Sequence, residues 1–203
     1  MRDPLFTPVH MNTMEIPNRI VMPAMHLGMA DQFQVTDQIV EFYRERARGG
    51  AGMICVGYAT VDDRSGSSLN IGAHDDHFIP GLSRLAQAIK EHGTRSCVQL
   101  NHAGRYNFSF FMDGKNPVAP SAIPSKMTRE MPKALEKEEI AGIVYSFGQA
   151  AGRVKQAGFD AVEILCGTGY LISEFVSPLT NQRQDEYGGS LDNRVRFALE
   201  VLQ

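Results

Sequence analysis

Four short runs rich in β-branched and apolar residues recur along the chain, and each ends in small or polar residues. They predict strands near residues 19–25, 52–60, 96–101 and 160–165. Between the runs, apolar residues spaced three and four positions apart predict amphipathic helices with stripes through Ile39 and Tyr43, Leu82 and Ile89, and Ile140 and Val154. Each helical stretch ends at a glycine suited to left-handed backbone, namely Gly50, Gly93 and Gly158. The pattern is therefore a repeat of strand and helix.

The predicted strands are almost continuously apolar, which indicates burial on both faces in a parallel α/β sheet. A doubly wound sheet and a (β/α)8 TIM barrel both produce this pattern. No GxGxxG motif follows any strand, and polar residues end every strand, so we favour the barrel. A barrel takes ~250 residues, and we expect residues 1–203 to form its N-terminal half, with roughly the first four strand-helix units. Because the open sheet edges would be costly, we expect a piece of a longer chain or pairing with another copy.

Two segments lie outside the repeat. The 103–135 segment carries four prolines and little apolar period, so it is predicted to be a long loop over the mouth of the barrel. The stretch from Met11 to Asn18 is predicted to be a short hairpin that closes the barrel floor.

Composition and charge exclude several classes of protein. With 43% hydrophobic and 21% charged residues, the chain has the composition of one globular domain. A net charge of -3 disfavours nucleic acid and anionic membranes as partners, and no apolar run or leader-like start suggests a membrane or secreted protein, so we expect a cytoplasmic one. Cys55, Cys97 and Cys166 stand singly, which indicates reduced thiols in the core and no metal site.

Gln99 ends the third strand, where its amide can both donate and accept hydrogen bonds. A flavin's pyrimidine edge presents N3–H beside two carbonyl oxygens, which suits a carboxamide, although a glutamine at a strand end more often caps backbone groups. The motif Gln-x-x-His-x-Gly-Arg, here Gln99, His102, Gly104 and Arg105, resembles the motif that supplies this flavin contact in the Old Yellow Enzyme superfamily. The loop from Gly167 to Glu200 resembles, above all, its 2,4-dienoyl-CoA reductase and NADH:flavin oxidoreductase branch.

The resemblance implies an FMN site at the strand ends. Its cofactor-binding residues would be Pro23, Ala24 and Met25 after the first strand, Ala59 in the second and Gln99 in the third. His26 stands where one subgroup carries a redox-tuning cysteine, so that tuning is not expected. Arg105 is expected to anchor the loop.

The end of the fourth strand departs from the pattern of the simple enone reductases. Leu165 and Thr168 stand at the two positions where those enzymes carry substrate-gripping imidazole or amide side chains, whereas Tyr170 is retained. The resemblance then implies Tyr170 as the catalytic proton donor, because a phenol of pKa ~10 is protonated at neutral pH. A tyrosine that only packs under the loop is the alternative.

The same resemblance implies a substrate site formed by His26, His102 and Thr168, with a structural imidazole as the alternative for His102. The string TNQRQDEYGGSLDNRVRF is expected to have a structural role: Gly188 and Gly189 allow a turn, Ser190 caps a helix, and Asp185 with Arg183 or Arg194 pins the loop.

The sequence thus predicts an FMN-dependent oxidoreductase that reduces an activated C=C bond of an enoyl- or dienoyl-type small molecule with electrons from NAD(P)H. A 4Fe-4S cluster and FAD belong, if anywhere, to a longer parent chain, because these residues carry motifs for neither. We expect association with the remainder of the barrel or a homo-oligomer. Two alternatives stay open: an amine dehydrogenase or demethylase of the same superfamily, and a non-catalytic half-barrel that acts as an assembly subunit.

Overall fold

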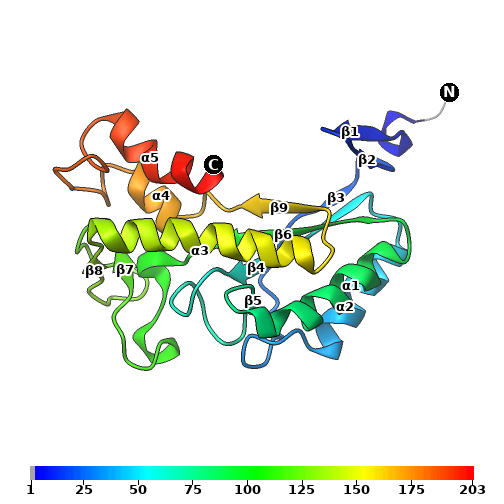
Figure 1. Cartoon of the computed structure of the whole chain (residues 1–203), viewed down its shortest axis with the longest axis horizontal. Coiled ribbons are helices and arrows are strands. Elements are labelled where there is room, and N and C mark those ends of the chain that lie inside the picture. The colour runs from blue at the N-terminus through cyan, green and yellow to red at the C-terminus, as the bar shows by residue number, and fades with distance from the viewer. Residues whose placement is uncertain (1–2) are drawn as a thin grey trace. The chain divides into compact units, whose positions relative to one another are not determined.

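A computed structural model describes residues 3–203 (Figure 1). The chain divides into two compact units. The first unit comprises the chain up to Ala59 together with Ser68–Leu100 and Ala151–Glu163. The second unit comprises Thr60–Ser67, Asn101–Ala150 and Ile164–Gln203.

The main sheet has the strand order β3-β4-β6-β9, with the short strand β5 (Ile71–Gly72) paired to β4. Its strands are β3 (Val21–Met22), β4 (Met53–Thr60), β6 (Arg95–Asn101) and β9 (Ala161–Ile164). β3 and β4 are parallel, with Val21 opposite Met53. The four strands predicted from the sequence are therefore present and adjacent in chain order. β3 ends earlier than predicted, because Pro23 has no N–H to donate to a strand ladder.

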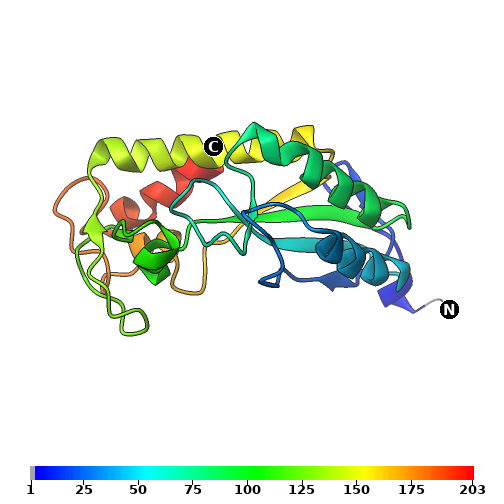
Figure 2. The same ribbon diagram turned by 90° about the horizontal axis from the view of Figure 1, so that it is seen from below.

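Two helices of the first unit, α1 (Asp37–Arg48) and α2 (Ile79–Lys90), pack against each other (Figure 2). The hydroxyl oxygen of Thr36 caps α1 by accepting a hydrogen bond from the N–H of Ile39. The predicted stripes are the buried faces of these helices. The three predicted glycines, Gly50, Gly93 and Gly158, have φ angles of 87°, 80° and 91°. Each releases the chain from its helix toward the next strand.

The predicted N-terminal hairpin is present but lies two residues earlier than expected. It consists of β1 (Val9–Met11) and β2 (Met14–Ile16) in antiparallel pairing. The shift has a local reason, since Asn12 takes a left-handed conformation with φ of 53° and so places the turn there. The guanidinium Nε of Arg95, at the start of β6, donates to the carbonyl oxygen of Glu15 at 2.6 Å. The hairpin is thereby held at the N-terminal end of β6, which is the end that a hairpin closing the floor of a barrel would cover.

The second unit contains α4 (Leu171–Val176), α5 (Leu191–Leu202) and most of α3 (Lys137–Gln156). The serine hydroxyl predicted to cap α5 does so, with Ser190 Oγ accepting from the N–H of Asn193 at 3.3 Å. α4 lies where a loop was predicted, and that part of the prediction is wrong. Its six residues are too few to show a helical period, although Leu171 and Phe175 bury one face.

The 103–135 segment is mostly irregular, as predicted, but it is not without regular structure. It contains β7 (Val118–Ala119) and β8 (Lys133–Ala134), which form a small parallel pair. Short 3-10 turns occur at Pro4–Phe6, Asp76–Phe78, Gly104–Tyr106 and Ser109–Phe111. Within residues 3–203, none of the helices combines the length and hydropathy that a bilayer-spanning segment requires.

Candidate active site

In the first unit, Gln99 of β6 is fixed by a neighbouring strand. Its side-chain Nε2 donates to a carboxylate oxygen of Glu163 on β9 at 2.5 Å. A carboxylate only accepts hydrogen bonds, so the contact determines which end of the amide faces Glu163. The carbonyl oxygen Oε1 is consequently turned away, and it can accept from a ring N–H at the strand ends.

The first two strands approach each other closely beside Gln99. A Cβ atom added to Gly57 of β4 would lie 2.3 Å from the Cβ of Ala24, a separation that packed carbons do not reach. Only glycine fits there. Pro23 and Met25 are exposed, Ala24 is half-buried, and the side chain of Ala59 is fully buried, so Ala59 can meet a ligand only through its backbone.

His26 follows β3 and meets a buried amide. Its Nδ1 lies 2.7 Å from Nδ2 of Asn70, which is 4% exposed. The rings of His26 and Tyr58 stack with their centroids 6.1 Å apart and their planes at 29°. Partial burial lowers the pKa of His26 below its ordinary value, so the ring is neutral at neutral pH.

In the second unit, Tyr170 sits at the N-terminus of α4 against a second phenol. The rings of Tyr106 and Tyr170 meet edge to face with centroids 6.1 Å apart. Gly169 makes this possible, because a Cβ there would lie 2.5 Å from a ring carbon of Tyr106 and its φ is +88°. Burial raises the pKa of Tyr170. Thr168 is exposed with φ of 63°, and its hydroxyl donates to the carbonyl oxygen of Gly167.

His102 is held inside the second unit with 1% of its surface exposed. Its Nδ1 accepts from the N–H of Gly104 at 3.1 Å, which leaves the proton on Nε2, 3.4 Å from a carboxylate oxygen of Asp62. Burial acts to raise the pKa of Asp62, but the neighbouring imidazole and local N–H and hydroxyl donors outweigh it and bring that pKa to about 2. The His102 carbonyl accepts from the N–H of Leu171. This geometry favours the structural alternative for His102.

Glu174 of α4 is a buried carboxyl beside the same turn. Its Oε1 accepts from the N–H of Arg105 at 3.0 Å, and a Cβ added to Gly104 would lie 2.6 Å from that oxygen. Burial raises the pKa of Glu174 to about 8, against a smaller lowering by Arg105. Arg105 also donates to the carbonyl oxygens of Ile123 and Pro124, and it therefore anchors the loop as predicted.

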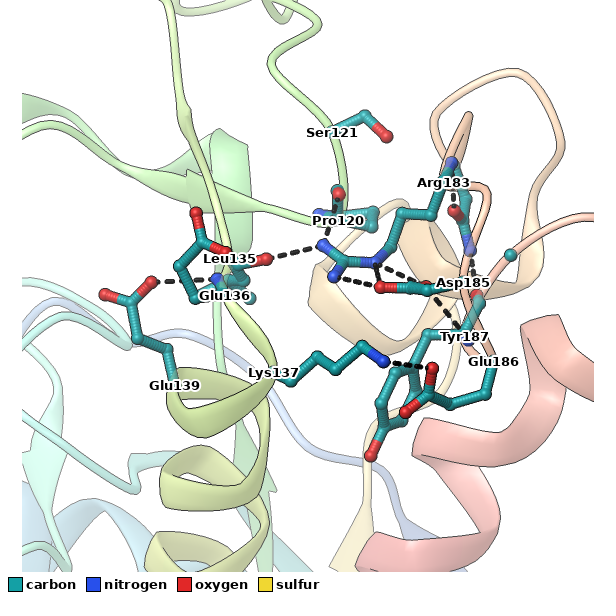
Figure 3. Close-up of polar contacts among 12 residues, drawn as sticks. Pro120, Ser121, Leu135, Glu136, Lys137, Glu139, Arg183, Asp185, Glu186 and Tyr187 are labelled. Carbon is teal, nitrogen blue, oxygen red and sulfur yellow. Dashed lines mark hydrogen bonds and ion pairs between the residues drawn. The ribbon is translucent and has the colours of Figure 1, made fainter.

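The long loop before α5 has the structural role predicted for it (Figure 3). Arg183 forms an ion pair with Asp185 at 2.6 Å and donates to the carbonyl oxygens of Pro120 and Leu135. Arg194 instead donates to the carbonyl oxygen of Val176. Of the two arginines considered, Arg183 is the one that holds Asp185.

The cysteines divide into two kinds. Cys55 and Cys97 are buried, as predicted, whereas Cys166 is exposed and its assignment to the core is wrong. The strand β9 ends at Ile164, so Cys166 already belongs to the loop. Within residues 3–203, no three histidine, cysteine or acidic side chains gather as metal ligands.

Three residues near the predicted site were missed from the sequence: Asn70, Glu163 and Glu174. Asn70 and Glu163 act on partners 44 and 64 positions away, so no local pattern marks them. The sequence gave a weak indication that Glu174 is buried, since this acidic residue stands between the apolar residues Ile172 and Phe175.

An α/β sheet that holds an oriented carboxamide on β6 is compatible with a flavin-dependent oxidoreductase. The comparison of sequences agrees, because the model of the NADH:flavin oxidoreductase / NADH oxidase family matches residues 4–203. The chain belongs to this family, whose members use FMN and NAD(P)H.

Particular relatives extend this result. A metal reductase from Desulforamulus reducens is 53% identical over 199 residues, which are 98% of this chain and 30% of the relative. A solved complex of 2-naphthoyl-CoA reductase with 2-naphthoyl-CoA has a TM-score of 0.94 and 33% identity, over 100% of this chain and 33% of that one. A morphinone reductase has a TM-score of 0.91 and 32% identity, over 98% of this chain and 57% of that one.

These matches confirm the Old Yellow Enzyme resemblance and the TIM-barrel fold, and the coverage of the relatives is that of a partial barrel. The chain spans between about a third and three fifths of the lengths of these relatives.

Proposed function

We propose that the protein is an FMN-dependent reductase of activated C=C bonds, of the enoyl or dienoyl type, with NAD(P)H as the electron donor. Bound FMN would supply hydride transfer to the carbon remote from an activating carbonyl. The observation that carries the proposal is Tyr170, a half-buried phenol at the N-terminus of α4 whose pKa is raised by burial.

The residues of the first unit suit the flavin. Glu163 directs the Gln99 amide so that its oxygen can accept from the pyrimidine N3–H. The small residues Gly57 and Ala24 pack closely, so no large side chain lies between the first two strands, which suits the approach of a planar ring to their backbone. We assign Pro23, Ala24, Met25, Ala59 and Gln99 to the cofactor.

Tyr170 is proposed to donate the proton that completes the reduction. A phenol with a raised pKa remains protonated at neutral pH and can give its proton to the carbon next to the carbonyl. The edge of Tyr106 packs on it and restricts its ring. A cleft of about 630 Å³ in the second unit is lined by Tyr106 and Gly169, two neighbours of Tyr170, although not by Tyr170 itself, and a cleft of this size can hold a small molecule.

We assign substrate contacts to His26 and Thr168, and an indirect part in the substrate site to His102. His26 is a neutral imidazole in the first unit, and Thr168 is exposed directly before Gly169 in the second. The buried His102 would act through the turn at Gly104 that its ring holds.

We also propose that this chain pairs with further barrel strands or a second copy. Within residues 3–203, the four main strands are paired in the order β3-β4-β6-β9. The two outer strands, β3 and β9, therefore each have one edge without a neighbour in that order. Such edges favour pairing with another strand.

The experiment that tests the function is stopped-flow kinetics of the FMN-loaded protein and its Tyr170→Phe variant. Flavin reduction by NAD(P)H should be unchanged, because it needs no proton from the phenol. Reoxidation by a cyclic enone or an enoyl thioester should slow by ~10²–10⁴-fold, the usual effect of a positioned general acid.

Tyr145→Phe is the matched control, since Tyr145 is 68% exposed on α3, and it should leave both half-reactions intact. An unchanged oxidative half-reaction in Tyr170→Phe would remove this residue from the mechanism. Flavin reduction by a tertiary amine without NAD(P)H would instead support the amine dehydrogenase.

A further inference from the structure

The contact between His26 and Asn70 joins an exposed imidazole to a buried amide. The stretch 68–72, which includes β5, is joined to the segment after β3 by three hydrogen bonds. The N–H of Phe33 donates to Ser68, that of Gly72 to Phe33, and that of Ala30 to Leu69, at 2.9, 2.8 and 3.4 Å. Asn70, 4% exposed, lies within this joined region, and its amide is therefore fixed against the imidazole.

The atoms that meet determine where the His26 proton lies. Nδ2 of Asn70 carries two hydrogens and no lone pair that can accept, so Nδ1 of His26 accepts the hydrogen bond at 2.7 Å. A neutral imidazole that accepts at Nδ1 carries its proton on Nε2. The rings of His26 and Tyr58 are stacked, and His26 is an exposed residue, so a ligand can reach its imidazole.

We propose that Asn70 is a positioning residue that holds His26 in its Nε2-protonated tautomer, so that His26 donates an uncharged hydrogen bond to the carbonyl oxygen of the substrate. The proposal rests on the function proposed above and adds how the carbonyl is recognised. Leu165 and Thr168 supply no imidazole after β9, whereas the segment after β3 supplies His26.

A neutral donor has a consequence for specificity. An imidazolium would attract a carboxylate through its charge, whereas a neutral N–H lacks that charge–charge attraction. We therefore expect the protein to reduce unsaturated thioesters and ketones without the strong preference for the corresponding free acids that an imidazolium would give.

The tautomer can be measured without flavin or substrate. In ¹⁵N-histidine-labelled protein at about pH 8.5, above the usual titration range of histidine, long-range ¹H–¹⁵N spectra distinguish a protonated from an unprotonated ring nitrogen. We expect His26 to show an unprotonated Nδ1 and a protonated Nε2. A protonated Nδ1 in the parent protein would overturn the proposal, and this result needs no variant that might fail to fold.

Asn70→Asp tests the cause of the tautomer. A carboxylate at this position can only accept, so the His26 proton should move to Nδ1. The exposed Asn116→Asp is the matched control and should leave His26 unchanged. His102 is an internal reference, because the Gly104 N–H donates to its Nδ1 in a contact that neither change touches. An Nε2–H tautomer that persists in Asn70→Asp would refute the role of Asn70.

The last measurement identifies the acceptor. In Asn70→Asp, Nε2 loses its proton, so the Kd of a cyclic enone or phenolic ligand for the FMN-loaded protein should rise ~10-fold, the usual effect of one lost hydrogen bond. The flavin spectrum without ligand should stay as in the parent. A changed flavin spectrum with unchanged ligand Kd would assign the hydrogen bond to a flavin carbonyl and overturn the substrate role. Tyr170→Phe kinetics test the reaction separately, so the two proposals fail independently.

Discussion

Glu174→Gln should remove the part of the pH dependence of the free energy of unfolding that the buried Glu174 carboxyl causes. Glu174 is 1% exposed, and burial raises its pKa from 4.5 to about 8. Because the folded state holds the proton more tightly than the unfolded state, the stability that Glu174 contributes is fully present below about pH 4.5 and is lost as the pH rises toward 8. Glutamine keeps an acceptor for the Arg105 N–H and has no charge to desolvate.

The size of the effect follows from the shift. At ~1.4 kcal/mol per pKa unit, the loss would be roughly 1.4 kcal/mol at about pH 5.5 and roughly 4–5 kcal/mol at about pH 8.5. We therefore expect wild-type protein to lose roughly 3 kcal/mol more than Glu174→Gln between these two pH values.

Urea unfolding of both proteins at several pH values measures the difference. The control is Glu138→Gln at an exposed position in the first turn of α3, which should shift stability by less than ~0.5 kcal/mol at every pH. If wild-type protein and Glu174→Gln show parallel pH dependence, then Glu174 ionises in the fold as it does in water, and the reasoning fails.

Two further predictions concern the cofactor face. Glu163→Leu should weaken FMN binding by ~10–100-fold, because a hydrogen bond to a charged group contributes ~1.5–3 kcal/mol and the Gln99 amide would turn freely without it. Glu163→Gln keeps an acceptor for that amide and should retain most of the affinity. Equal FMN Kd values in the wild-type protein and both variants would contradict the role of Glu163. Gly57→Ala should lower the free energy of unfolding in urea by ~1–3 kcal/mol through its clash with Ala24. Adding Ala24→Gly should restore part of that stability. A Gly57→Ala variant as stable as the wild-type protein would show that the two strands do not meet so closely.

The sequence by itself determined the repeat of strand and helix. Apolar periodicity is a local property, so it located α1, α2 and α3, and the glycines after them marked where each helix ends. It also located Gln99 near the end of β6 and Tyr170 in the segment that follows β9, where the structure has the N-terminus of α4. Short elements were not predicted, because the prediction depends on periodicity and the six residues of α4 are too few to show a period.

Only the tertiary structure decided the chemical state of the site residues. The direction of the Gln99 amide depends on Glu163, and the proton of His26 depends on Asn70, partners that are 64 and 44 positions away. The pKa of Glu174 depends on how completely the second unit covers it. Hydrogen-bond direction and desolvation act over a few ångströms in space, and chain order does not report which distant residues come that close.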